Sequence, residues 1–316
     1  MERNIFMTIE YDGSDFCGWQ RQPNVRTVQG HLEEVLSHVC GKEIKLNGTS
    51  RTDAGVHALG QCASFRGEFG IPTDRIMLAA NNILAGGRQP LKGIGDVRIT
   101  SLREMPPDFH ARFSSRGKKY RYLIRNLPEP DIFRRNYCYQ VPQPLDIESM
   151  REAAAYIVGT HDFKCFQAAG GEEKETTVRT IYRLCVEPRG EDIAIEVSGD
   201  GFLYNMVRII VGSLVKVGCG FWKPEQIKEA LEARDRSKAG PKAPAEGLTL
   251  ISIEEETLPA VIREENEHWS YRVNQGEIES FGKAYIQIYA CDECDAGIRK
   301  RQGAGPQCGR GRGCVL

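Results

Sequence analysis

Two spacings of hydrophobic residues alternate along the first third of the chain. Residues 4–11 are rich in β-branched and aromatic side chains, which predicts a strand that ends at Asp12 and Gly13. A helical spacing follows, and Thr27 before it and Gly41 after it predict the N-cap and the end of a helix. The apolar face of this helix consists of Val28, Leu32, Val35, Leu36 and Val39.

The pattern continues to about residue 102. Strands are expected at 44–49 and 61–65 around a loop at 50–60, followed by a helix at 74–84 and a strand at 97–102. The resulting order, β-α-β-β-α-β, is that of a ferredoxin-like unit.

The second half has a similar but less regular order. Asp146 predicts the N-cap of a helix, and the apolar face of that helix would hold Ile147, Met150, Ala154, Ile157 and Val158. The other expected elements are a strand at 119–125, a hairpin of 180–187 and 192–198, helices at 202–217 and 224–233, and a last strand at 248–253. No sequence repeat relates the two halves.

Composition adds little to this picture. The 316 residues are 41% hydrophobic and 27% charged, with 42 basic and 43 acidic side chains, so any nucleic-acid site must come from local clustering. The first residues carry charges and no long apolar run, and the apolar stretch 206–217 is shorter than a membrane span of roughly 18 to 20 residues. Eleven cysteines without an export signal predict reduced thiols and a cytoplasmic protein that does not bind membranes.

The segment 48–61, GTSRTDAGVHALGQ, holds the most informative chemistry. Arg51 and Asp53 lie between two glycines, and a carboxylate beside a fixed guanidinium stays ionised, which suits a nucleophile. A loop salt bridge without function is the alternative. A glycosidase would need a second carboxylate, and a serine hydrolase would need a serine between glycines; the loop supplies neither.

Two further segments are candidates for the site. Residues 109–128 hold six basic and no acidic side chains between aromatic rings, which is typical of a strip that follows a phosphate backbone, although a solvated strand face is an equal alternative. The basic residues are Arg112, Arg116, Lys118, Lys119, Arg121 and Arg125. In the apolar segment 199–218, Arg208 would need a carboxylate partner if it is buried, or would extend to the surface.

Together these segments resemble the TruA family of tRNA pseudouridine synthases. The resemblance covers residues 4 to 253 in unchanged order, and its most specific part is the octet Arg51 to Ala58. The other matching pieces are Tyr11-Asp12-Gly13, Gly18-Trp19-Gln20, Thr27-Val28-Gln29-Gly30, Leu32-Glu33, the run Phe109 to Phe113 with Tyr120 and Tyr122, Gly159 to Phe163, Phe202 to Arg208 with Gly212, and Ala243 to Leu248.

The resemblance implies a site and a reaction. Asp53 would be the catalytic aspartate, Arg51 and Arg208 its supporting arginines, Tyr120 the base-stacking tyrosine, and Leu248 or Leu250 an apolar residue beneath the target base. The implied reaction makes pseudouridine at positions 38 to 40 of the tRNA anticodon arm. The implied enzyme is a homodimer that uses no cofactor or metal, and Arg112, Arg116, Lys118 and Lys119 would help to bind the tRNA.

The fold class implied is α+β. Two ferredoxin-like halves would form a continuous antiparallel sheet, with helices on one face and a central cleft. The expected divisions are 1–115 for the half with the Asp53 loop, 116–256 for the half that completes the cleft, and 257–316 for an extension of unknown role.

Several features depart from the family or leave alternatives open. Ser50 stands where the family usually has glycine, and 85–89 replaces a usual Leu-Pro connection. A non-catalytic RNA-binding protein is the rival reading, which the combined presence of Arg51, Asp53, Tyr120 and Arg208 disfavours. In the tail, Cys291, Cys294, Cys308 and Cys314 offer a possible structural zinc site, but a second Cys-x2-Cys is missing. A Gly- and Arg-rich tail that contacts RNA is the favoured alternative.

Overall fold

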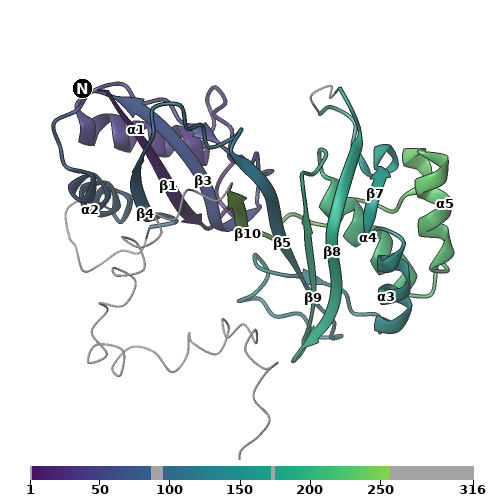
Figure 1. Cartoon of the computed structure of the whole chain (residues 1–316). Coiled ribbons are helices and arrows are strands. Elements are labelled where there is room, and N and C mark those ends of the chain that lie inside the picture. Colours follow the sequence, from purple (N-terminus) through teal and green to yellow (C-terminus); the bar gives the residue numbers. More distant parts are fainter. Residues whose placement is uncertain (1, 87–94, 172–174, 256–316) are drawn as a thin grey trace, which may run out of the picture. The chain divides into compact units, whose positions relative to one another are not determined.

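One mixed sheet runs through both predicted halves of the chain (Figure 1). The computed structural model describes residues 2–86, 95–171 and 175–255, all of which belong to the unit Met1–Glu256. Ten strands in these ranges join the sheet, in the order β4-β1-β3-β10-β5-β9-β8-β7, with β2 paired to β3 and β6 to β5. The cysteine tail and the segment 87–94 lie outside the described residues.

The first half has the predicted order of elements. They are β1 (Arg3–Tyr11), α1 (Val28–Cys40), β2 (Asn47–Gly48), β3 (His57–Gly67), α2 (Thr73–Leu84) and β4 (Val97–Met105). The Thr27 hydroxyl accepts a hydrogen bond from the Gly30 amide, and Gly41 ends α1 with a φ of 67°, as expected for an N-cap and a left-handed C-cap. Part of the predicted loop 50–60 is wrong, because His57 already begins β3 and pairs with β10.

The second half contains the remaining elements. They are β5 (Ser115–Arg125), β6 (Tyr139–Gln140), α3 (Ile147–Ala155), β7 (Gly159–Asp162), β8 (Val178–Arg189), β9 (Asp192–Gly199), α4 (Met206–Gly218), α5 (Glu225–Ala233) and β10 (Leu248–Glu255). Short 3₁₀ turns lie at Lys164–Phe166 and Arg236–Lys238. The predictions missed the short strands β6 and β7, whose two and four residues carry too little periodicity.

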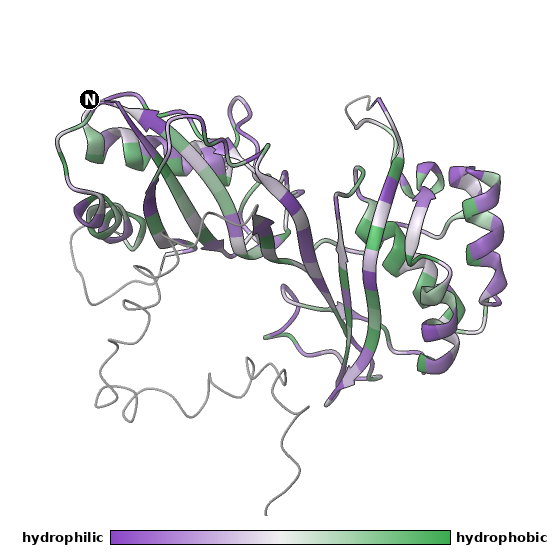
Figure 2. Cartoon of the chain, viewed as in Figure 1, coloured by the Kyte–Doolittle hydropathy of each residue, from purple (hydrophilic) through white to green (hydrophobic). Residues whose placement is uncertain are grey.

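Two predicted helices have different ends in the structure. Helix α4 begins at Met206 instead of 202, because Asn205 before it has a φ of 59° and interrupts the helical backbone. Helix α3 ends at Ala155, so Ile157 is buried from the following turn and Val158 is 39% exposed rather than on the apolar face. Nearly all of α4 is buried, in keeping with the mostly hydrophobic residues along it (Figure 2).

The last strand, β10, joins the two halves at the centre of the sheet (Figure 1). It is antiparallel to β5 but parallel to β3, where Thr249 pairs with His57 and Leu250 with Ala58. The prediction of a wholly antiparallel sheet is therefore wrong at this pairing and at the short β5–β6 contact. The Leu123 amide donates to the Gly247 carbonyl, and the Tyr122 hydroxyl donates to the Pro244 carbonyl. These contacts fix the beginning of β10 next to β5, so that β10 runs antiparallel to β5 and parallel to β3.

The junction between β3 and β10 leaves no room for a side chain at Gly60. A Cβ atom there would lie 2.4 Å from the Ile251 carbonyl oxygen. We expect Gly60→Ala to lower the free energy of unfolding by about 1–3 kcal/mol, because the backbone of β10 must shift. Urea denaturation measures the effect.

Gly70→Ala is the matched control, because nothing lies within 4 Å of a Cβ at that position. It should be neutral or slightly stabilising through the unfolded chain. Equal midpoints for the two variants would show that the β3–β10 contact does not hold the halves together.

Candidate active site

The loop that carries Asp53 is fixed by hydrogen bonds from three directions. The Trp19 amide donates to the Thr52 carbonyl over 3.0 Å, and the hydroxyls of Tyr11 and Thr52 lie 2.6 Å apart. From β3, the Gln61 side-chain amide donates to the Ser50 carbonyl over 2.7 Å. Buried polar groups with satisfied partners hold one geometry, so the position of Asp53 is set before any ligand binds.

Two glycines let the chain before α1 approach this loop closely. A Cβ atom at Gly13 would lie 2.0 Å from the Val56 carbonyl oxygen, and one at Gly18 would lie 2.7 Å from the Thr52 carbonyl oxygen. Gly18 also has a φ of 85°, which disfavours other residues. The motifs that contain these glycines therefore support the Asp53 loop from behind.

Arg208 provides a positive charge at Asp53. Its Nη1 atom donates to the Asp53 Oδ2 atom over 3.1 Å and to the Asn205 Oδ1 atom over 3.0 Å. Its Nε atom donates to the Ala243 carbonyl oxygen over 2.8 Å. Arg208 is only 8% exposed, so the prediction that a buried guanidinium would find a carboxylate is confirmed, and the alternative that it extends to the surface is wrong.

Tyr120 lies beside this ion pair. Its hydroxyl is 2.8 Å from the Ser50 hydroxyl, and its ring meets the Phe202 ring edge to face at 5.3 Å between centroids. Burial raises the pKa of Tyr120 to about 12, and Asp53 acts in the same direction. Ser50, the residue that departs from the family pattern, is thus the hydrogen-bond partner of this tyrosine.

These residues line one cavity of about 230 Å³. Arg51, Asp53, Arg112, Lys118, Tyr120, Arg208 and Leu248 all contribute to its wall. The Asp53 carboxylate is 22% exposed and can therefore be reached from the cavity. Leu250 is fully buried and pairs with Tyr120 in the sheet, so Leu248 is the one of the two leucines that lines the wall.

Comparison with known proteins agrees with this arrangement. A family model described as tRNA pseudouridine synthase matches residues 7–114 and 153–254. The chain is 45% identical over 251 residues to tRNA pseudouridine synthase A of Acetivibrio thermocellus, which covers 79% of the chain and 99% of that protein. The protein named tRNA pseudouridine synthase A 2 of Clostridium perfringens is 48% identical with the same coverage. The chain belongs to the tRNA pseudouridine synthase family.

The basic strip of this family member divides between the two faces of β5. Tyr120 and Lys118 face the cavity, and the Lys118 Nζ atom donates to the Thr49 carbonyl over 3.0 Å. Lys119 and Arg121 alternate with them and bind Glu196 on β9, at 3.1 and 2.7 Å. Arg112 and Arg116 are exposed, but only Arg112 lines the cavity.

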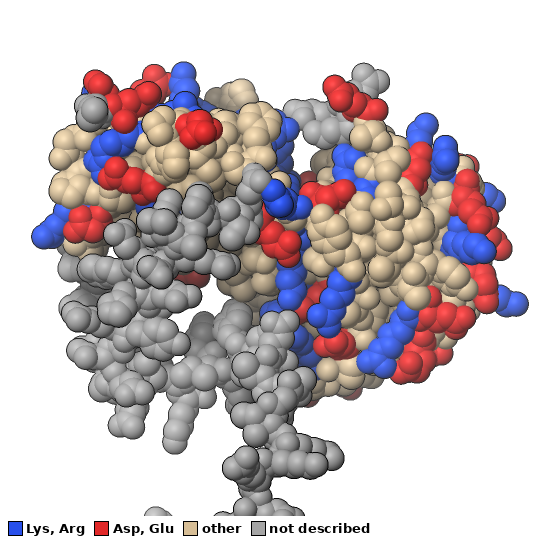
Figure 3. Space-filling model, in the orientation of Figure 1, with Lys and Arg blue, Asp and Glu red and all other residues tan. Residues whose placement is uncertain are grey.

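The strip is therefore not one surface. The alternation of side chains along a strand sends neighbouring residues to opposite faces. On the molecular face shown in Figure 3, basic and acidic side chains are interspersed.

Sequence reasoning missed a second polar cluster behind the Asp53 loop. The Asp12 carboxylate lies 3.2 Å from His57 Nδ1 and accepts a hydrogen bond from the Tyr137 hydroxyl over 2.6 Å. The contact with His57, together with bonds from Ser14 and Tyr137, holds the pKa of Asp12 well below its usual range. Asp12 and His57 belong to the family motifs, but Tyr137 carries no sequence signal because its contact spans 125 residues.

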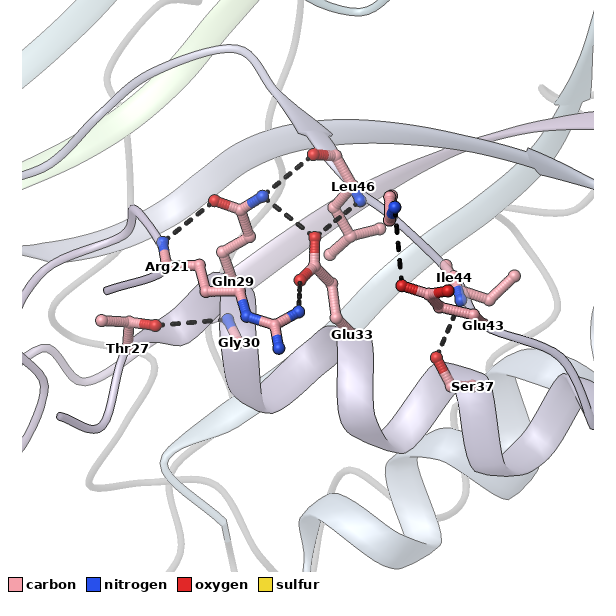
Figure 4. Close-up of polar contacts among 10 residues, drawn as sticks. Arg21, Thr27, Gln29, Gly30, Glu33, Ser37, Glu43, Ile44 and Leu46 are labelled. Atoms are coloured by element: carbon pink, nitrogen blue, oxygen red, sulfur yellow. Dashed lines mark hydrogen bonds and ion pairs between the residues drawn. The ribbon is translucent and has the colours of Figure 1, made fainter. Parts of the chain in front are cut away.

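A buried carboxylate on α1 holds the chain that leads to β2 (Figure 4). Glu33 accepts hydrogen bonds from the Leu46 amide over 2.9 Å and from the Gln29 side chain over 3.0 Å. The Arg21 guanidinium completes the cluster at 3.0 Å from Glu33. Since β2 enters the Asp53 loop directly, Glu33 and Gln29 position that loop through the backbone at Leu46.

Within 2–86, 95–171 and 175–255, no group of three or more His, Cys, Asp or Glu side chains could hold a metal ion. The same ranges contain no helix that is long and apolar enough to cross a membrane. The four cysteines considered for zinc lie outside the described residues, so that hypothesis stays untested.

The raised pKa of Tyr120 predicts a loss of stability in alkali. The unfolded phenol titrates near pH 10, whereas the folded one keeps its proton to about pH 12. Stability is therefore unaffected below pH 10 and falls between pH 10 and 12, by about 1.4 kcal/mol per pH unit for this group. Tyr120→Phe should remove this contribution, so the urea midpoint of the variant should fall less steeply with pH than that of wild type between pH 9 and 11.5. Other groups whose pKa values burial raises, among them Tyr11, Tyr122 and the Cys165 thiol, contribute to the remaining slope. Parallel curves for variant and wild type would contradict the prediction.

The Glu33 cluster predicts a second stability effect. Glu33→Ala leaves the buried Leu46 amide without its acceptor and should cost about 1–3 kcal/mol of unfolding free energy. Glu34→Ala, one residue along and exposed, is the control and should change little. Thermal unfolding of both variants measures the difference. A Glu33→Ala variant as stable as the control would mean that water replaces the carboxylate at no cost.

Proposed function

We propose that this chain converts uridine to pseudouridine in tRNA, with Asp53 as the nucleophile. The observation that carries the proposal is the Asp53–Arg208 ion pair of 3.1 Å in the wall of a cavity that also contains Tyr120. A partly exposed carboxylate held by a buried guanidinium is placed to attack, and it has few conformations to lose on doing so.

The reaction needs no net change in atoms. The bond from ribose C1′ to N1 of uracil breaks, and a bond from C1′ to C5 forms. The hydrogen on C5 leaves as a proton, and N1 gains one. The Asp53 carboxylate could either attack C1′ and release uracil or add to C6 of the ring. Both routes need a site that excludes water while sugar and base are apart.

The cavity suits a uridine that has left the base stack. Tyr120 would stack on the flipped base, and Leu248 would lie beneath it as an apolar floor. Arg51 and Arg112 are exposed at the same cavity and would contact the phosphates next to the target. We propose positions 38 to 40 of the anticodon arm as the targets, which rests on the family resemblance.

We further propose that 1–115 and 116–256 are two ferredoxin-like halves and that the enzyme is a cytoplasmic homodimer. The 42 basic and 43 acidic residues leave the chain with almost no net charge, so a tRNA would be bound by local basic clusters, and two copies would double their number. Of the predicted phosphate contacts, Arg112, Arg116 and Lys118 remain candidates, while Lys119 would first have to leave Glu196. Light scattering with activity measured at the same concentration tests the dimer, which a fully active monomer would refute.

The nucleophile is tested by Asp53→Asn. The amide oxygen can still accept from Arg208, so tRNA binding should survive, while tritium release from tRNA labelled at uracil C5 should fall by roughly 10³-fold or more. The control is Asp74→Asn, an exposed carboxylate on α2 that should leave release unchanged. Substantial release by Asp53→Asn would remove Asp53 as nucleophile. No release by wild type, with tRNA still bound, would favour a non-catalytic RNA-binding protein.

A further inference from the structure

A second, smaller cavity opens beside the one that contains Asp53. Its volume is about 190 Å³, and it shares Gly48, Arg51 and Arg112 with the first cavity. Its wall adds three aromatic residues, of which Trp19 is buried and His110 and Phe113 lie nearer the surface. It also adds two exposed amide side chains, those of Gln20 and Asn47. The described residues that line it include no Asp or Glu.

The rings of His110 and Phe113 lie against each other at the surface. Their centroids are 4.4 Å apart with 37° between the planes. Phe113 is 80% exposed, whereas Phe109, four residues earlier, is buried in the core. This exposed ring lies at a cavity that two arginines also line, and that combination suits a nucleic-acid base and its phosphate.

The backbone that carries these two rings is held in place. Phe109 and Ala111 are buried, and the Phe109 carbonyl accepts a hydrogen bond from the Asn4 side chain over 2.8 Å. The amides of Phe113 and Ser114 both donate to the His110 carbonyl over 3.0 Å, which closes a tight turn. These anchors leave His110, Arg112 and Phe113 outside on a backbone that is already ordered, so little backbone entropy is lost when a ligand binds them.

We infer that His110 and Phe113 stack a second RNA base, next to the uridine that enters the Asp53 cavity. The inference rests on the proposed function for the identity of the RNA. An exposed aromatic ring accepts the face of any base, and the two arginines shared by the cavities would neutralise the phosphates that connect the two nucleotides. Continuity with the Asp53 cavity and the absence of acidic residues from the described wall favour RNA over a second copy of the chain.

The test is a double-mutant cycle between Phe113 and the base. Binding is measured in the Asp53→Asn background, so that the RNA stays unmodified. Three tRNAs are compared: the intact tRNA, one that lacks the base on the 5′ side of the target uridine, and one that lacks the base on its 3′ side. Phe113→Ala should weaken binding of intact tRNA by about 5- to 150-fold. With one of the two abasic tRNAs the same substitution should have almost no effect.

Further variants separate stacking from other causes. Phe113→Trp should retain affinity, and Phe113→Leu should lose it as Phe113→Ala does, because leucine is apolar without a ring face. The matched control is Phe221→Ala, which removes a ring that is 68% exposed beside Lys216 and lies at neither cavity. It should bind like wild type.

Three results would overturn the stacking site. They are an equal loss with intact and both abasic tRNAs, wild-type affinity in Phe113→Leu, or a change of oligomeric mass in Phe113→Ala. The last would make Phe113 part of an interface between copies. Tritium release by wild type is measured separately. If Phe113 is coupled to the neighbouring base but wild type releases no tritium, the stacking site stands and the proposed reaction is refuted. If wild type releases tritium but Phe113 shows no coupling, only the stacking site is refuted.

Discussion

Asp53 and Arg208 are separated by 155 residues, and their ion pair lies where the two halves of the sheet meet. A buried guanidinium without a carboxylate partner would be costly, and a carboxylate without Arg208 would lose its fixed orientation. Much of the surrounding structure meets the needs of this pair. Asn205 adopts a left-handed backbone at the start of α4 and accepts from Arg208, and the Ala243 carbonyl accepts from the other side.

The support for Asp53 reaches well beyond the cavity. Close backbone approach at Gly13 and Gly18 places the loop against the chain before α1, and Glu33 holds the strand that enters it. These contacts explain why the family motifs extend over residues that touch no cavity wall. A reactive side chain on a loop needs such packing, because each unsatisfied or mobile group beneath it would widen the range of its positions.

Strand β10 has a similar role for the second half. It lies between β3 and β5, and its first residue, Leu248, forms part of the cavity wall while the next inward one, Leu250, supports Tyr120. The alternation along β5 then decides which basic residues face the cavity. Lys118 and Tyr120 face the cavity, whereas Lys119 and Arg121 are held by Glu196. The basic residues that are continuous in the sequence are thus divided between the cavity wall and an ion-pair cluster around Glu196.

Local sequence determined the parts of this protein that depend on neighbours in the chain. The cap at Thr27, the glycine end of α1, the helix α2 and the two strands of the hairpin β8–β9 follow from short-range periodicity and backbone preference, although β8 is longer than predicted and includes Pro188 and Arg189. The octet around Asp53 marks the loop that lines the cavity. The predicted start of α4 was four residues too early, because tertiary contacts hold Asn205 in a left-handed backbone conformation that interrupts the helix. Only the tertiary structure decided that β10 runs parallel to β3, that the Asp53–Arg208 pair has a geometry of 3.1 Å in a cavity wall, and that Phe113 is presented outward at the cavity that Arg51 also lines. These features join residues far apart in the chain, and the energy that selects them comes from burial and pairing that no local window contains.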